Sequence, residues 1–236
     1  MKNSTASARD IIYKEILDKI QYCEWAPGTL ISEPKLSELF GLSRTPVREA
    51  LHVLEQEGFV EIVPQSGSFV SKIDLKRIRE ILFLRYHLEL PILEELAAEK
   101  AAIPETVSRL MEGMERETAA ENWKEAVRLD YCIHEELIRF AGYEHIWKII
   151  GKELPHYTRF RFFEPKHGEF RGANPRSIGE HKAILTYIGR GDTEGLRSVL
   201  QSHYDFTLVL RREYNTERIG DHADYFVNLQ LLDPGL

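Results

Sequence analysis

The chain has 236 residues, 43% of them hydrophobic and 29% charged, and its formal net charge is −7. These totals allow a sizeable core in one or two globular domains and exclude a general polyanion binder, so any contact with nucleic acid must come from a local patch. The two cysteines, the N-terminus unlike a signal peptide and the lack of an apolar run of roughly 18 residues predict a cytoplasmic protein with no disulfide framework, no cysteine metal cluster and no membrane partner.

Residues 1–73 begin with the pattern of three short helices. In DIIYKEILDKIQY, isoleucine recurs every four residues from Ile12 on, which predicts a first amphipathic helix. In ISEPKLSELFGLS, Ser32 is a good N-cap for a second helix. A third helix is predicted to begin at Ser43 or Thr45 and to end near Glu57.

The third helix begins with positive charge that its apolar face does not explain. If it packs through Val47 and Leu51, it displays Arg44, Thr45 and Arg48 outward. Arginine can donate two hydrogen bonds to guanine in the major groove of DNA, and the N–H groups at a helix start favour phosphate. A solvated face with arginines paired to nearby glutamates explains the same pattern, so periodicity alone leaves both interpretations open.

Two β-rich runs follow in FVEIVPQSGSFVS, joined by Pro-Gln-Ser-Gly. Such runs around a turn predict a β-hairpin. Three helices and a hairpin in this order predict a winged helix-turn-helix domain over residues 1–73.

The run PGTLISEPKLSELFGLSRTPVREALHVLEQEGFVEIVPQSGSFV resembles the DNA-binding domain of the GntR family of bacterial transcription regulators, and SRTPVREAL, EGFV and GSFV are its specific parts. The resemblance implies that Arg44, Thr45 and Arg48 contact double-stranded operator DNA. It further places three residues near the DNA backbone or minor groove, namely Ser43, Ser66 and Gly67. Some members have an arginine in the second helix where this chain has Pro34, and we expect Lys35 to replace that contact.

The charge of this domain bears on how it holds DNA. Residues 1–75 carry eight Lys or Arg and eleven Asp or Glu, a net charge of −3. Bulk charge therefore does not attract DNA, and we expect operator binding to require a homodimer that reads two half-sites.

From residue 74 onward the pattern is helical, which makes the predicted fold class mainly α, with an all-α bundle over 74–218. The expected helices are 75–101 (bent or broken at Pro91), 104–120, 122–141, 144–163, 177–189 and 193–214. The composition of 164–176 predicts a long loop. Residues 219–236 form a tail, for which disorder and docking on a partner are both open.

Four polar side chains occupy apolar stripes of these helices. Asp130 and His134 lie four residues apart on one face, and His181 and His203 take stripe positions in the last two helices. Burying an unpaired charge is costly, so these groups need partners. One Asp and three His are the ligand types of a Zn²⁺-like divalent site. The alternative is that each of the four is a separate core residue with a single hydrogen bond. Ser177 and Glu180 are predicted to form a capping box at the start of the helix that carries His181.

The stretch LRYHLELPILEELAAEKA, the D-x-x-x-H at 130–134, EHKAIL and the last histidine are similar to the FCD effector domain of a large GntR subfamily, over roughly residues 74–214. The resemblance implies that a divalent metal is held by four ligands: Asp130, His134, His181 and His203. Zn²⁺ is the first choice, with Ni²⁺, Mn²⁺ and Fe²⁺ as alternatives. It also implies that a small carboxylate or sugar acid binds beside the metal.

Two further positions are candidates for that acid. Arg85, in the family's R-x-x-x-E context with Glu89, is expected either to bind the effector's carboxylate or to form a structural pair with Glu89. One of Arg159 and Arg161 is expected to face the same cavity, and we take Arg159 as the candidate.

The combined expectation is a bacterial DNA-binding regulator, a repressor rather than an activator and not an enzyme, in which the effector modulates operator binding. A regulator that senses the metal itself is an alternative. HEELI at 134–138 resembles half of the H-E-x-x-H motif of zinc peptidases, but Ile138 stands in place of the second histidine, so a metallohydrolase is a minor alternative.

Overall fold

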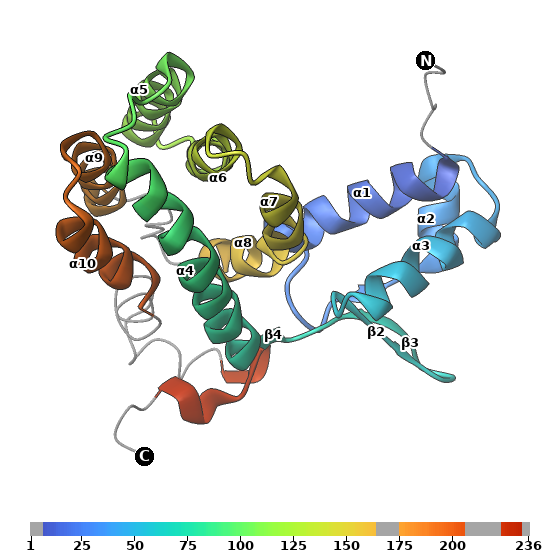
Figure 1. Cartoon of the computed structure of the whole chain (residues 1–236). Coiled ribbons are helices and arrows are strands. Elements are labelled where there is room, and N and C mark those ends of the chain that lie inside the picture. Colours follow the sequence, from blue (N-terminus) through green and yellow to red (C-terminus); the bar gives the residue numbers. More distant parts are fainter. Residues whose placement is uncertain (1–6, 164–174, 206–222, 233–236) are drawn as a thin grey trace.

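The computed structural model describes residues 7–163, 175–205 and 223–232, and over these residues the fold is mainly α, which confirms the predicted class (Figure 1). The predicted loop at 164–176 falls almost entirely outside the described residues. So do the second half of the helix expected at 193–214 and parts of the tail. None of the described helices has the length and apolarity needed to cross a membrane.

The N-terminal part contains the three expected helices and a small antiparallel sheet. The helices are α1 (Ala8–Gln21), α2 (Glu33–Phe40) and α3 (Arg44–Gln56), and the strands are β1 (Leu30–Ile31), β2 (Val60–Val63) and β3 (Gly67–Val70), in the order β1-β3-β2. The hairpin β2–β3 is the predicted wing. β1 adds a third strand that was not predicted, because two residues are too short to show a period.

Apolar side chains of α1 and α3 form a separate core for this part. Ile12, Ile16 and Ile20 of α1 are fully buried, and they pack with Val47, Leu51 and Leu54 of α3. At the start of β3, Gly67 has φ +122°, and a Cβ built there would lie 3.0 Å from Leu30 Cδ1. Only glycine fits the wing at this point, because the backbone is in the left-handed region and β1 approaches closely.

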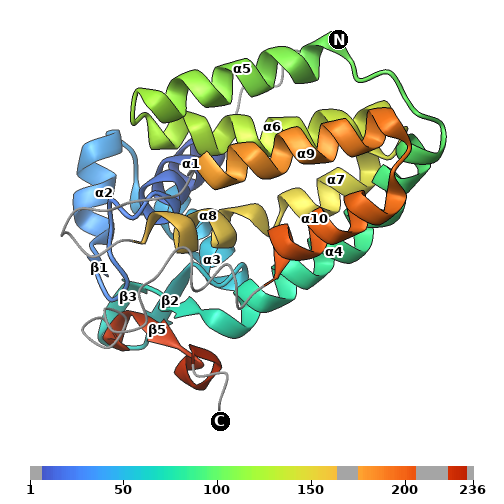
Figure 2. The same ribbon diagram turned by 90° about the vertical axis from the view of Figure 1, so that its left-hand side faces the viewer.

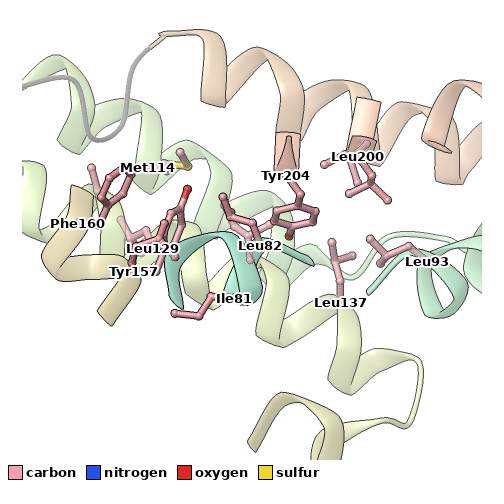
Figure 3. Close-up of a cluster of buried hydrophobic side chains, with 14 of the residues drawn as sticks. Ile81, Leu82, Leu93, Met114, Leu129, Leu137, Tyr157, Phe160, Leu200 and Tyr204 are labelled. Carbon is pink, nitrogen blue, oxygen red and sulfur yellow. The ribbon is translucent and has the colours of Figure 1, made fainter. Parts of the chain in front are cut away.

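The C-terminal part is a helical bundle of seven helices in the described residues (Figure 2). They are α4 (Leu75–Ala98), α5 (Glu105–Ala119), α6 (Trp123–Phe140), α7 (Glu144–Gly151), α8 (Leu154–Phe162), α9 (Pro175–Arg190) and α10 (Thr193–Tyr204). Figure 3 shows side chains of α4, α5, α6, α8 and α10 meeting in its core, with Tyr204 near Leu82.

Three expectations for these helices need correction. The single helix predicted for 144–163 is two helices, because Pro155 has no N–H to donate and is accommodated in the first turn of α8, which begins at Leu154, instead of continuing α7. α4 runs unbroken through Pro91. α9 begins at Pro175, so Ser177 lies inside the helix and not at its N-cap.

The described part of the tail lies against the linker between the two parts of the chain. It consists of η1 (Ala223–Tyr225), β5 (Phe226–Val227) and η2 (Leu229–Leu232). β5 pairs in parallel with β4 (Ile73–Asp74), which stands directly before α4 (Figure 1). Neither alternative for the tail holds for residues 223–232, which are ordered and pack against their own chain.

Candidate metal centre and nucleic-acid interface

Three histidines from three helices meet inside the bundle. His134 of α6, His181 of α9 and His203 of α10 each place a ring nitrogen so that all three lie within 4.8 Å of one another. His134 and His181 are 1% exposed. Their Nε2 atoms are 3.0 Å apart. Of the three helices, α9 and α10 lie side by side (Figure 2).

Each ring is oriented by an acceptor on its outer side. His181 Nδ1 lies 2.7 Å from the Ser177 carbonyl oxygen, His134 Nδ1 lies 2.7 Å from Glu89 Oε2, and His203 Nδ1 lies 2.8 Å from Glu180 Oε2. A carbonyl or carboxylate oxygen can only accept, so each Nδ1 carries the hydrogen. In each neutral ring, Nε2 then carries a free lone pair, which is what a metal ligand needs.

The fourth predicted ligand, Asp130, reaches the same point. Its Oδ1 lies 3.3 Å from His181 Nε2, and its Oδ2 accepts a hydrogen bond of 2.9 Å from Arg161 Nη1. Burial raises the pKa of Asp130, but Arg161 and the three histidines together lower it by more than burial raises it. The net shift of the pKa is downward, and the group is a carboxylate. The structure thus brings the three histidines into one group, with Asp130 in contact with one of them, His181.

The arrangement of these atoms is electrostatically unfavourable unless a positive charge lies among them. Two imidazole lone pairs and a carboxylate oxygen face one another at 3.0 and 3.3 Å, which is repulsive unless a cation or a proton lies among them. A proton on His181 is disfavoured, because burial lowers the pKa of this ring to about 3. Three nitrogens and one oxygen are a donor set that suits a divalent transition metal, so the residues fit such an ion.

Arg85 lies beside this cluster and is fully buried with its partner. Its Nε donates to Glu89 Oε1 at 2.8 Å, and the exposed fractions of the two side chains are 1% and 0%. Among the described residues, its Nη2 has no hydrogen-bond partner. The guanidinium is surrounded by the rings of Tyr204, Tyr131 and Trp147 at 4.8, 5.8 and 6.0 Å. The pair with Glu89 therefore occupies one edge of Arg85, while Nη2 has no hydrogen-bond partner among the described residues.

The structure does not place Arg159 in this cluster, which corrects the expectation for that residue. Its Nη1 donates to Ser71 Oγ at 3.1 Å, and its Nη2 donates to the Ser71 carbonyl. Arg159 is 1% exposed and has no acidic partner among the residues that the structure describes, and burial lowers its pKa to about 10. Of the two arginines weighed from the sequence, Arg161 faces the cluster and Arg159 faces the linker.

His156 of α8 and Arg77 of α4 also bind the N-terminal part. His156 Nε2 donates to the Glu57 carbonyl at 2.9 Å, and the His156 ring stacks on Phe59 with centroids 3.8 Å apart. Arg77 Nη1 donates to the same carbonyl at 2.9 Å. Gly58 allows this approach, since a Cβ there would lie 2.9 Å from Arg77 Nη1. Burial, followed by the charges of Arg77 and Arg159, lowers the pKa of His156 to about 3.

The candidate DNA-contacting residues are all exposed. They are Lys35 of α2, Ser43, Arg44, Thr45 and Arg48 at the start of α3, and Ser66 and Gly67 in the wing. The Ser43 side chain makes no capping hydrogen bond, so the first turn of α3 keeps open N–H groups. Arg48 Nε lies 2.8 Å from Glu33 Oε2, which joins α3 to the start of α2.

Sequence reasoning missed the groups that orient the ligands. Glu180 was read as a helix cap, and Tyr204, which donates to Glu89 Oε2 at 2.7 Å, was not considered. Both have a signal, because Glu180 and Tyr204 each stand next to a predicted ligand in the sequence. The contacts of His156 and Arg159 had no such signal, since they depend on how the two parts of the chain meet.

Both parts of the chain match known protein families. The family described as bacterial regulatory proteins, gntR family, matches residues 8–70, and the FCD domain matches residues 80–206. An HTH-type transcriptional regulator from an unstable DNA locus of Streptomyces ambofaciens is 32% identical over 94% of this chain and 89% of its own. The HTH-type transcriptional repressor RspR of Escherichia coli is 28% identical over 85% of this chain and 87% of its own.

The fold is also similar to a solved one. The crystal structure of a GntR transcriptional regulator from Rhodococcus sp. RHA1 superimposes with a TM-score of 0.72, over 89% of this chain and all of that one, at 19% identity. At this identity the likeness concerns the fold alone.

Proposed function

Because the chain belongs to the gntR family of bacterial regulatory proteins and carries an FCD domain, we propose that this DNA-binding regulator is a cytoplasmic homodimeric repressor that releases its operator when a small organic acid binds beside a divalent metal. The observation that supports the proposal is the set of inward lone pairs at His134, His181 and Asp130, which a bound cation would stabilise. The repressor RspR among its relatives supports the direction of control.

In this proposal the metal is held by Asp130, His134, His181 and His203. Zn²⁺ suits the donor set best, and Ni²⁺, Mn²⁺ and Fe²⁺ remain alternatives. A bound divalent ion would offer a Lewis-acidic centre to an oxygen of the acid. Arg85 would hold the acid's carboxylate through its unoccupied Nη2, while Glu89 fixes the guanidinium in place.

The DNA contacts of the proposal are the exposed residues at the head of α3 and in the wing. Arg44, Thr45 and Arg48 would read bases, and Ser43, Lys35, Ser66 and Gly67 would contact the sugar-phosphate backbone or the minor groove. We keep 1–73 and 74–218 as the proposed DNA-binding and effector domains, with 219–236 as a C-terminal extension.

A thermal-shift screen of small carboxylates and sugar acids tests the proposal. It uses the full chain, either loaded with Zn²⁺ or treated with a chelator. A ligand at about 100 times its Kd contributes roughly 2.7 kcal/mol to the free energy of unfolding, which is easily measured. We expect Zn²⁺ to stabilise the wild type but not His181→Ala, with exposed His145→Ala as the matched control. We expect at least one acid to stabilise only the metal-loaded form and to weaken operator binding in a gel-shift assay.

Three outcomes contradict parts of this proposal. If Zn²⁺ stabilises His181→Ala as much as the wild type, the metal assignment is wrong. If metal stabilises the protein but no acid does, and chelation alone changes operator affinity, the protein senses the metal itself. A light-scattering mass of 27.4 kDa, instead of twice that value, would contradict the dimer.

The structure offers little support for the metallohydrolase alternative. Glu135, the base that HEELI would supply, is exposed on the side of α6 away from the buried His134. The relatives described above are regulators.

A further inference from the structure

The described residues of the C-terminal extension, 223–232, lie against the linker and the neighbouring helix α4. Residues 223–232 lie beyond both matched regions, which end at residues 70 and 206. Their strand β5 pairs with β4, so that Phe226 is opposite Ile73 and Val227 is opposite Asp74. β4 lies in the linker that joins the DNA-binding domain to α4.

Phe226 anchors this contact in the main core. It is 3% exposed and belongs to the same buried cluster as Ile73, Leu75 and Phe163. Its ring meets the Phe163 ring edge-on at 4.9 Å, and the Tyr225 ring lies 5.2 Å from Phe163. Burying a phenylalanine against aromatic neighbours is among the stronger apolar contacts that one side chain can make.

Asn228 adds a polar contact at the first residue of the bundle. Its Nδ2 donates to Asp74 Oδ1 at 2.5 Å. The same oxygen accepts from the Lys76 backbone N–H at 2.9 Å, because Asp74 is the N-cap of α4. Asn228 has φ +62°, a left-handed conformation that asparagine tolerates better than most residues. The side chain thus ties the extension to the cap that starts α4.

The linker is held from its other end by α8. Arg159 donates two hydrogen bonds to Ser71, and Ser71 Oγ donates to the Gly58 carbonyl at 2.6 Å. The short stretch from Ser71 to Asp74 is therefore fixed by α8 at one end and by residues 223–232 at the other. A linker with such contacts resists reorientation of the domains that it joins.

We propose that residues 223–232 form a clasp that fixes the interdomain linker and thereby holds the DNA-binding domain in one orientation on the helical domain. The clasp adds a strand pairing and a buried aromatic anchor to the hydrogen bonds by which α8 already holds the linker. Its effect on the linker is independent of which ligand the protein binds, whereas its effect on operator control rests on the proposed function.

Hydrogen–deuterium exchange of the full-length protein tests the clasp. Phe226→Ala removes the buried anchor, and Asn228→Gly removes the hydrogen bond to Asp74 while keeping the left-handed backbone accessible. Val227→Ala is the matched control, because the Val227 side chain lies in the same strand but is 39% exposed.

In both clasp variants we expect amides of residues 71–76 to exchange faster by on the order of tenfold, while peptides of α6 are unchanged. The control should exchange like the wild type. If Phe226→Ala does not fold, Asn228→Gly decides the question alone. Unchanged protection of 71–76 in the variant that folds, or equal loosening by Val227→Ala, overturns the clasp.

A second measurement separates the clasp from the proposed function. With a loosened linker, the change in operator affinity on chelation or on adding an acid should shrink at least severalfold. If exchange at the linker increases but the wild type itself shows no metal- or acid-dependent affinity, the clasp stands and the proposed function fails. If operator affinity of the wild type responds to metal or acid but the linker does not exchange faster in the clasp variants, the proposed function stands and the clasp fails.

Discussion

Arg159 and Arg161 show how two residues of one helix serve different sites. Consecutive helical residues are 100° apart, so positions two apart point in nearly opposite directions. Arg161 holds Asp130 in the ligand cluster, and Arg159 holds Ser71 in the linker. Both are buried, so composition could not tell which side of the helix faces the cluster.

This division predicts different effects on Zn²⁺ affinity for two matched substitutions. Arg161→Met should lower Zn²⁺ affinity by about 10–100-fold, because a partner that orients a ligand carboxylate is lost. Arg159→Met should leave Zn²⁺ affinity unchanged and lower the thermal midpoint, since the hydrogen bonds to Ser71 disappear. Calorimetric titration with Zn²⁺ measures the first effect. Equal loss of affinity in both variants would show that the geometry of α8 has been misread.

Arg48 is the residue on which DNA recognition should depend most. Replacement by Ala is expected to cost about 1–3 kcal/mol of operator binding, enough to abolish a gel shift near the wild-type Kd. The fold should be unaffected, because Arg48 is exposed and its pair with Glu33 is a surface ion pair. Exposed Arg109→Ala on α5 is the control. Unchanged operator affinity of Arg48→Ala, with native circular dichroism, would refute the assignment.

The four proposed ligands could be found from the sequence because each breaks an apolar stripe, a local signal that survives without the fold. Asp130 and His134 share a face by spacing alone. Arg85 was left between two roles, and the structure explains why, since it pairs with Glu89 through Nε and keeps Nη2 open. The outer acceptors of the rings, such as the Ser177 carbonyl, are backbone or long-range groups that no pattern marks.

At the scale of elements, helices with a clear apolar period were predicted well, and elements without one were predicted poorly. α5 and α6 follow the 3.6-residue period closely and appear within a residue or two of their predicted ends. α8 was merged with α7 because it is buried on several sides and has no polar face to mark its start. β1 and β5 have two residues each and form only where another strand is present.

α8 should make stability depend on pH through His156. The pKa of this ring is lowered to about 3 from about 6.5 in an unfolded chain, so between these values only the unfolded state binds the proton. Stability is therefore complete above pH 6.5 and declines as the pH falls toward 3. Between pH 7 and 5 the loss from His156 is expected to be about 2 kcal/mol.

Urea unfolding of metal-free wild type and His156→Gln at pH 7 and pH 5 measures this contribution. The variant should lose less stability than the wild type between the two values, because glutamine does not titrate. The other histidines are the same in both proteins, so the difference between the proteins isolates His156. Parallel losses would mean that the ring is protonated in the folded state or reaches solvent.

At the scale of the whole molecule, the proposed control of DNA binding must be reciprocal. If an acid weakens operator binding by a given factor, the operator must weaken acid binding by the same factor, typically about 5–150-fold. Titrating the acid that succeeds in the thermal-shift screen into protein, with and without an operator duplex, should give this ratio. A factor that differs between the two directions would show that acid and DNA do not act on one two-state equilibrium.

The division into an N-terminal and a helical part was readable from the switch between short elements and long periodic ones. How the two parts meet was not, because the contacts of Arg77, His156 and Arg159 join residues up to 99 positions apart. The return of residues 223–232 to the linker was equally unpredictable, since a two-residue strand has no pattern of its own.

α4 has a mechanical consequence. It is a single rod of 24 residues that begins at the linker, and Arg85 lies ten residues beyond its first residue, Leu75. At 1.5 Å per residue, the distance along the axis is about 15 Å, so a tilt of about 5° around Arg85 would displace the linker end by about 1.3 Å. In the proposed dimer, a ligand that tilts α4 at Arg85 would thus change the spacing of the two recognition helices without any rearrangement inside the DNA-binding domain.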